Sequence, residues 1–193
     1  MAPSPSDTQT LNLLLHRRSV KAKAMTEPGP DHTQLREILK AAIRVPDHGK
    51  LNPWRFIVLA GQDREKLGAL ISKGLKAEGK VSAKICEKMA GYATQGPVLI
   101  IAVSSPVKHR AIPHFEQLLS MGAACQNLLI ASHSLGFVGQ WLTGWAATSP
   151  TVKAGLDLKS HEKIAGFLFL GSQGCEPSER PRPNFDDVVQ WGL

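Results

Sequence analysis

The sequence has 193 residues, of which 42% are hydrophobic and 20% charged, and its formal net charge is +7 at pH 7. This length and apolar content are typical of a single globular domain over residues 1–193 and exclude a disordered chain. The positive charge suits an anionic ligand or a nucleic acid, while no segment approaches the ~18 apolar residues of a membrane span.

The first half of the chain predicts helices around one strand. Asp7 and Asp31 can each cap a helix, and the second helix carries apolar residues at helical spacing and stops before Pro46. The apolar run that follows is typical of a buried strand. In chain order we expect helices over residues 7–16, 31–43, 63–75 and 80–93, with the strand over residues 56–60.

The second half predicts the central strands and the longest helix. Residues 98–103 form a continuous apolar run after a Gly-Pro pair, which is typical of a central strand. A helix over residues 114–134 has small residues at its centre, where another backbone of the same or a second subunit could come close. Further elements are expected as a strand and turn over residues 136–144, a short helix from Pro150, a strand over 164–170 and a Pro-rich tail over 172–184. This order predicts an α+β fold in which a small, mixed, mostly antiparallel sheet packs between helices.

The motifs of several enzyme classes are absent. The sequence has no GxGxxG, P-loop, HExxH or paired CxxC motif, so a Rossmann nucleotide site, a triphosphate site and a zinc centre lack support, and we expect no metal. The three cysteines (Cys86, Cys125 and Cys175) lack CxxC spacing, which favours reduced thiols. Residues 1–6 have no apolar signal-peptide core, and we therefore expect a cytoplasmic protein.

Three polar clusters remain as candidates for a binding site. Residues 17–21 (RRSVK) combine guanidinium donors, a hydroxyl and an ammonium, which suit a phosphate, although cations also complement the end of a helix. Residues 44–56 alternate polar donors between two prolines, although a lone loop histidine is commonly a surface residue. Residues 180–183 (RPRP) place two arginines on one side of an extended chain, as in a phosphate clamp or a basic polyproline-like tail.

Taken together, these clusters resemble the nitroreductase family of FMN-dependent oxidoreductases, most closely its small, minimal subgroup. The matching runs occur in the family's order from about residue 10 to residue 183: "HRRSVK", "VPDHGKLNPWRF", "GFVGQWLTG", "GFLFLG" and the Arg-x-Arg tail. The Pro-Trp-x-Phe loop together with Arg-x-Ser is the most specific part. His48 and Thr143 depart from the residues of many relatives, which affects the expected substrate preference more than flavin binding.

The resemblance implies an FMN site in an intertwined homodimer. By similarity, the residues that would contact FMN are Arg17, Arg18, Ser19, Lys21, Arg44, Pro46, Asp47, His48, Lys50, Asn52, Trp141, Leu142, Thr143, Gly144, Arg180 and Arg182. Residues 17–21 would form the flavin cradle, and the arginine pair near the C-terminus would help to hold the phosphate. Residues 44–52 would come from the other subunit.

The resemblance also implies NADH or NADPH as electron donor and a small acceptor, such as a nitro compound or a quinone. The expected mechanism is ping-pong hydride transfer without a catalytic side chain, because the cofactor carries the chemistry. One further stretch either contacts the nicotinamide or is simply the C-terminus of a helix. It comprises Ala131, Ser132, His133, Ser134, Leu135 and Gly136.

Two other functions stay open. One is a basic nucleic-acid-binding module. The scattered arginines and the lack of interleaved aromatic residues argue against it. The other is an enzyme of the same flavin fold with a different reaction, such as dehalogenation.

Overall fold

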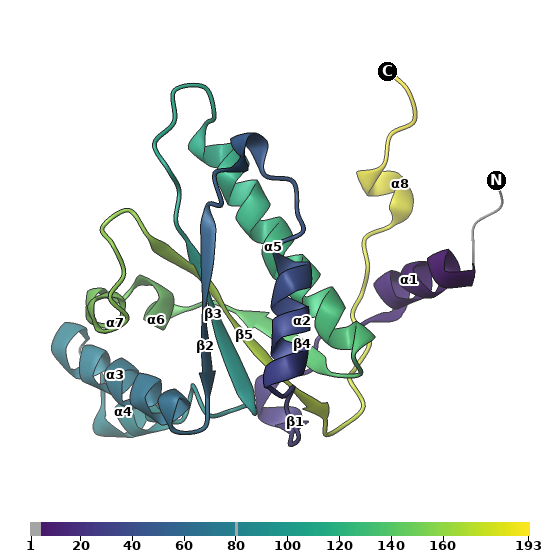
Figure 1. The fold of residues 1–193 in the computed structure, drawn as a ribbon. Helices are drawn as coiled ribbons and strands as arrows, with labels where there is room; N and C mark the ends of the chain where they lie inside the picture. The colour runs from purple at the N-terminus through teal and green to yellow at the C-terminus, as the bar shows by residue number, and fades with distance from the viewer. Residues whose placement is uncertain (1–4, 80) are drawn as a thin grey trace.

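The computed structural model describes residues 5–79 and 81–193. Its centre is a five-stranded sheet in the order β1–β5–β3–β2, with β4 also paired to β5 (Figure 1). The strands are β1 (Met25–Thr26), β2 (Trp54–Ala60), β3 (Val98–Ser104), β4 (Val138–Leu142) and β5 (Lys163–Gln173). All the described strand pairs are antiparallel. The predicted α+β fold is confirmed, and the sheet is antiparallel rather than mixed among these residues.

Helices lie on both faces of this sheet. They are α1 (Pro5–His16), α2 (His32–Ala42), α3 (Gln62–Glu78), α4 (Ala83–Ala90), α5 (His114–Ser134), α6 (Trp145–Thr148), α7 (Pro150–Gly155) and α8 (Phe185–Val188), with 3-10 turns η1 (Ala22–Ala24) and η2 (His48–Lys50). Within the described residues, no helix combines the length and the apolar character that crossing a membrane requires.

Local capping explains where two of these helices begin. Asp31 accepts a hydrogen bond from Gln34 N at 2.8 Å while the Gln34 side chain accepts one from Asp31 N at 2.9 Å, a reciprocal cap that starts α2 as expected. By contrast, α4 is shorter than the predicted range of 80–93, because Ser82 caps its start and Gly91 follows its last residue.

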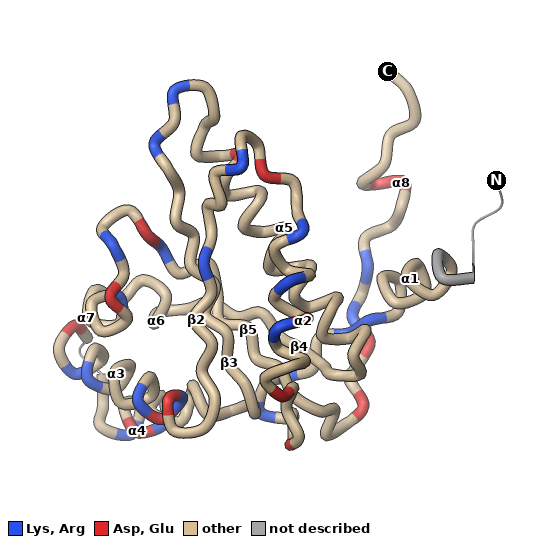
Figure 2. The backbone as a smooth tube through the Cα atoms, viewed as in Figure 1, with Lys and Arg blue, Asp and Glu red and all other residues tan. Residues whose placement is uncertain are grey.

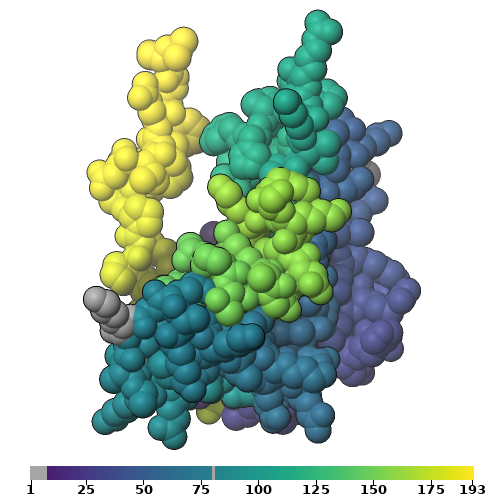
Figure 3. Space-filling model, turned by 90° about the vertical axis from the view of Figure 1, so that its left-hand side faces the viewer, coloured from purple at the N-terminus to yellow at the C-terminus, as the bar shows by residue number. Residues whose placement is uncertain are grey.

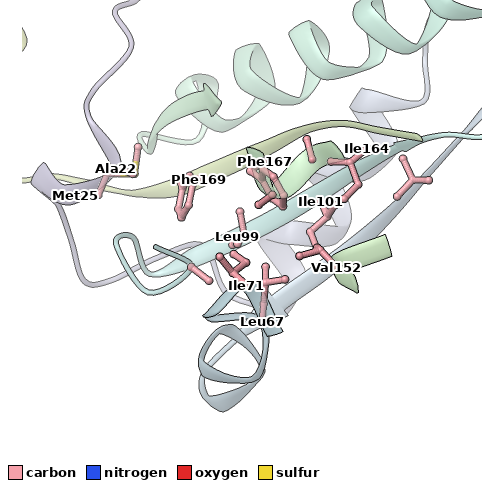
Figure 4. Packing of buried hydrophobic residues seen from close by; sticks show 14 of the residues in the cluster. Ala22, Met25, Leu67, Ile71, Leu99, Ile101, Val152, Ile164, Phe167 and Phe169 are labelled. Carbon is pink, nitrogen blue, oxygen red and sulfur yellow. The ribbon is translucent and has the colours of Figure 1, made fainter. Parts of the chain in front are cut away.

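The core consists of two apolar layers, one on each face of β3. Alternate residues of the strand point to opposite faces, so Leu99, Ile101 and Val103 pack toward α3 and α4 while Val98, Ile100 and Ala102 pack toward α2 and α5. Figure 4 shows the first layer, in which Leu67 and Ile71 of α3 lie beneath the strands. Every residue of β3 is buried, which accounts for its uninterrupted apolar sequence.

An ion pair between the partly exposed Arg55 and the buried Glu162 ties β2 to the loop before β5. Glu162 is 2% exposed. Its carboxylate accepts hydrogen bonds from Arg55 Nε and Nη2, each at 2.8 Å, and from Lys159 N at 2.9 Å. The hydrogen bonds from Arg55, more than any other contact, lower the pKa of Glu162 from 4.5 to about 2. A paired carboxylate of this kind stabilises the fold only while it stays ionised.

We predict that Arg55→Met lowers the free energy of unfolding by about 3 kcal/mol, because it leaves a buried charge without its partner. In the wild type, the unfolded carboxyl takes up a proton near pH 4.5 and the folded one only near pH 2. The contribution of Glu162, also about 3 kcal/mol, is therefore complete above pH 4.5 and lost as pH falls toward 2.

Urea unfolding between pH 7 and pH 2.5 measures both effects. Lys66→Met is the control, because it removes an exposed pair with Asp63 within one helix and should leave the unfolding midpoint unchanged. An Arg55→Met protein with the wild-type midpoint and acid profile would contradict this account of the pair.

Candidate functional site

The two arginine clusters at opposite ends of the sequence meet in one cavity. This cavity, here called the arginine pocket, has a volume of about 220 Å³ and is lined by Leu14, Leu15, Arg17, Arg18, Ser19, Ser178, Arg180 and Arg182. Figure 2 shows Lys and Arg both at the end of α1 and along the start of the C-terminal tail beside it. The separate predictions of clusters 17–21 and 180–183 thus describe a single site.

Sheet register explains why these clusters meet. Met25 of β1 pairs with Gln173 of β5, and Gly174 N continues the ladder by donating to Ala24 O at 3.1 Å. Because the pairing is antiparallel, the chain before Met25 and the chain after Gln173 leave the sheet at the same end. Residues 18 and 180 are both seven positions from this pair, so the chain returns the second cluster to the first.

The arginine pocket concentrates positive charge around Arg17. Its Nη2 donates to Ser19 Oγ at 3.3 Å, while its Nε is shielded from water and has no hydrogen-bond partner among the described residues. Burial, followed by the charges of Arg182 and Arg18, lowers the pKa of Arg17. Four arginines line the pocket and no carboxylate does so among the residues described, an arrangement that favours a bound anion.

Glu179 offsets part of this charge from the rim. Its carboxylate pairs with Arg18, lies 3.5 Å from Arg182 Nη2 and accepts from Arg180 N at 2.9 Å. These contacts, led by the backbone hydrogen bond of Arg180, lower the pKa of Glu179. The carboxylate thereby holds three arginines near the pocket without lining it.

A second cavity adjoins the arginine pocket. It has a volume of about 160 Å³ and shares Ser19, Ser178 and Arg180 with the first, while Lys21 and Cys175 belong to the second alone. Sequence reasoning assigned no role to Ser178 or Cys175. The signal that could have found Ser178 and Cys175 is their distance along the chain from the end of β5. This distance becomes informative only once the β1–β5 pairing is known.

Strand β4 contacts the segment of residues 19–24 that contributes to this second cavity. Gln140 Oε1 accepts a hydrogen bond from Ala22 N at 2.7 Å, which joins β4 to the segment that follows Lys21. Trp141 donates from Nε1 to Ala165 O at 3.1 Å, and Leu142 is half-buried while Thr143 and Gly144 are exposed. Gly144 has φ 127°, a conformation that side chains rarely adopt.

The loop that carries Pro46, Asp47, His48, Lys50 and Asn52 is held in a defined shape. The two carboxylate oxygens of Asp47 accept from Leu51 N at 3.1 Å and from Asn52 N at 2.9 Å. Lys50 (φ 55°) and Asn52 (φ 51°) both adopt left-handed conformations, as does Gly49. Left-handed residues other than glycine persist only where their surroundings impose them, and such positions cluster at functional sites.

This loop lies far from the arginine pocket of its own chain. His48 Nδ1 is 2.7 Å from Glu116 Oε2 in the first turn of α5, whereas α1, which leads into the pocket, lines a cavity with His133 in the last turn of that helix. At ~1.5 Å per residue, Glu116 and His133 are about 25 Å apart along α5. One chain therefore does not bring residues 46–52 to the cavity formed by residues 17–21.

Residues 131–136 form the end of α5 and the turn after it. Leu135 N donates to Ala131 O, Gly136 N to His133 O and Phe137 N to Ser132 O, and Gly136 has φ 85°, so the helix C-terminus in the prediction is confirmed. Ser132 is buried and donates to Leu128 O at 2.8 Å. The nicotinamide contact stays a prediction.

A groove of about 480 Å³ between α2 and α5 contains three members of that stretch. Ala131, Ser134 and Leu135 line it together with Arg44, whose backbone carbonyl accepts from Asn127 Nδ2 at 3.0 Å. Arg44 is thus separated from the loop that follows it and lies on the α2–α5 surface.

His133 is half-buried and is a member of the stretch that faces α1. Its Nε2 is shielded from water and has no partner among the described residues. Burial, followed by the charge of Arg17, lowers the pKa of His133 from 6.5 to about 4, so the ring is neutral near pH 7.

The sequence matches the family model described as "Nitroreductase family" over residues 14–172. A protein of Escherichia coli (strain K12) with the provisional name NAD(P)H nitroreductase YdjA is 35% identical over 87% of this chain and 90% of its own. Iodotyrosine deiodinase 1 of Rattus norvegicus is 26% identical over 92% of this chain and 67% of its own.

Solved structures share the fold at lower identity. A nitroreductase-like family protein from Bacillus cereus superposes with a TM-score of 0.78 at 23% identity, covering 99% of this chain and 98% of that one. A nitroreductase family structure from Desulfovibrio desulfuricans, described as a complex with FMN, superposes with a TM-score of 0.73 at 20% identity over 100% and 99% of the two chains. From the match over residues 14–172 and the identity with YdjA, the chain belongs to the nitroreductase family.

Proposed function

We propose that this protein is an FMN-dependent oxidoreductase that uses NADH or NADPH to reduce nitro compounds, quinones or similar small acceptors. The arginine pocket is the observation that carries the proposal, because its guanidiniums and hydroxyls form a built site for a phosphate. The buried Nε of Arg17 has no partner among the described residues, which indicates that these residues do not satisfy the cluster by themselves. Bound FMN would supply hydride transfer, which no side chain of the site can perform.

Each part of the site has a distinct task in this proposal. Arg17, Ser19, Arg180 and Arg182 hold the phosphate, and Arg18 stays near it through Glu179. Lys21, in the adjoining cavity, places an ammonium where it stabilises negative charge on the ligand. Residues 141–144, at the end of β4 and in the turn after it, would lie along the flavin ring.

The protein would act as a homodimer, because residues 46–52 cannot reach the arginine pocket of their own chain. Large apolar side chains are exposed on three segments that a second copy would cover: Leu11, Leu14 and Leu15 of α1, Phe115, Leu118 and Leu119 of α5, and Phe185, Val188 and Trp191 of the C-terminal tail. Figures 1 and 3 show this tail extending away from the body of the protomer. Unpartnered apolar surface of this extent is typical of a subunit interface.

Dehalogenation remains the alternative reaction, supported by the similarity to iodotyrosine deiodinase 1. Both reactions would use the same cofactor site, so the arginine pocket does not distinguish them. Steady-state assays with a nitroaromatic compound, a quinone and an iodinated phenol separate the two, and we expect turnover with the first two.

We predict that the purified protein binds about one FMN per chain and that Arg17→Ala weakens binding about 10- to 100-fold, as the loss of a charge-assisted hydrogen bond should. Quenching of flavin fluorescence measures the affinity. Arg36→Ala, an exposed change on α2, should bind FMN as the wild type does. A wild-type protein that takes up no flavin would refute the proposal.

A second prediction tests the homodimer at Gly122 of α5, where an added Cβ would meet no atom of its own chain within 4 Å. Gly122→Glu should therefore fold, but its charge should disrupt the contact between α5 helices and give a monomer with weakened FMN binding. Light scattering measures the mass. Gly91→Glu, where the added Cβ has ordinary contact distances, is the matched control and should stay dimeric.

A third prediction concerns the kinetic mechanism. Burial raises the pKa of the Cys125 thiol to about 12, which makes it unreactive. We expect parallel double-reciprocal lines for NAD(P)H and a quinone, because one cavity would receive donor and acceptor in turn. Serine variants of Cys86, Cys125 and Cys175 should retain turnover within a few-fold, and intersecting lines would contradict the mechanism.

A further inference from the structure

Two buried nitrogen atoms near the arginine pocket lack hydrogen-bond partners among the described residues: Arg17 Nε and His133 Nε2. They belong to different parts of the chain that lie against each other, since α1 packs on α5 and Leu13 lines one cavity with His133. Because Arg17 N donates to Leu13 O, Arg17 lies one turn beyond the residue that shares a cavity with His133. The charge of Arg17 is the second cause, after burial, of the lowered pKa of His133.

The two atoms have complementary chemistry. The Nε of arginine is always a donor, because guanidinium does not lose its proton in proteins. A neutral imidazole that carries its proton on Nδ1 has a free lone pair on Nε2 and accepts one hydrogen bond. Buried polar atoms are nearly always paired, so an unpaired donor beside an unpaired acceptor indicates a contact that forms in another state of the site.

The orientation of Arg17 indicates when this contact forms. Its backbone N donates to Leu13 O at 2.9 Å, which fixes the root of the side chain as a continuation of α1. Its Nη2 donates to Ser19 Oγ, so the terminal nitrogens lie on the side of the arginine pocket. The Nε is the nitrogen of this guanidinium that is buried without a partner among the described residues.

We propose that His133 is a positioning residue for the arginine pocket, and that its neutral Nε2 accepts a hydrogen bond from Arg17 Nε when an anion occupies the pocket. This contact locks the guanidinium with both Nη atoms directed at the anion. It also requires a neutral ring, because an imidazolium carries a proton on both nitrogens and cannot accept a hydrogen bond. The inference rests on the proposed function in that FMN is the anion used to test it.

The test compares FMN affinity and ligand-free thermal stability in three variants. His133→Phe keeps a ring in the buried site but removes the acceptor, and should weaken FMN binding about 10-fold with an unchanged or raised unfolding midpoint. His133→Gln restores an acceptor oxygen and should return the affinity to within about threefold of wild type. His32→Phe, an exposed change at the start of α2, is the matched control and should alter neither quantity.

Other results would overturn the inference. Wild-type affinity in His133→Phe would show that the ring does not hold Arg17. Equal losses of affinity and stability in the Phe and Gln variants would show a role in packing alone, and His133→Leu would take the place of a His133→Phe protein that fails to fold. Failure of the wild type to bind FMN would instead reject the proposed function itself.

Discussion

The antiparallel pairing of β1 with the end of β5 is the interaction on which the candidate site depends. Strand β1 is only two residues long, yet its register with β5 brings together two segments some 160 positions apart in the sequence. Shifting this register by one residue would turn alternate side chains to the opposite face and displace Arg180 and Arg182 from Arg17, Arg18 and Ser19. A small number of backbone hydrogen bonds therefore determines whether four positive charges form a pocket or remain dispersed.

The arginine pocket also shows how a folded chain tolerates repelling charges. The lowered pKa of Arg17 reflects burial and two neighbouring arginines, all of which disfavour the arrangement in the absence of an anion. This cost is offset by the well-packed sheet, whose central strand is buried on both faces. The core beneath the site thus maintains a concentration of charge that α1 and the tail alone would not hold.

Much of the fold could be predicted from the sequence, because its signals are local. The apolar run of β3 and the Asp31–Gln34 cap can each be recognised within a few residues, and both were confirmed. The polar clusters were also recognised, but their meeting was visible only through the family resemblance. Strand β1 is too short for any periodic signal, and the roles of Ser178 and His133 depend on contacts between distant segments. Tertiary contacts of this kind leave no pattern in one sequence.

The loop held by Asp47 separates the residues that determine its shape from those that it displays. The Asp47 carboxylate and the left-handed backbone define the curve, whereas the side chains of His48, Lys50 and Asn52 are exposed and carry little of the packing. Substitutions at His48 therefore alter what the loop presents at small cost to folding, while changes at Asp47 affect the whole turn. Such a division lets selection vary the chemistry of one surface independently of its scaffold. A family that shares one fold can in this way diversify its substrates through single exchanges at such a loop.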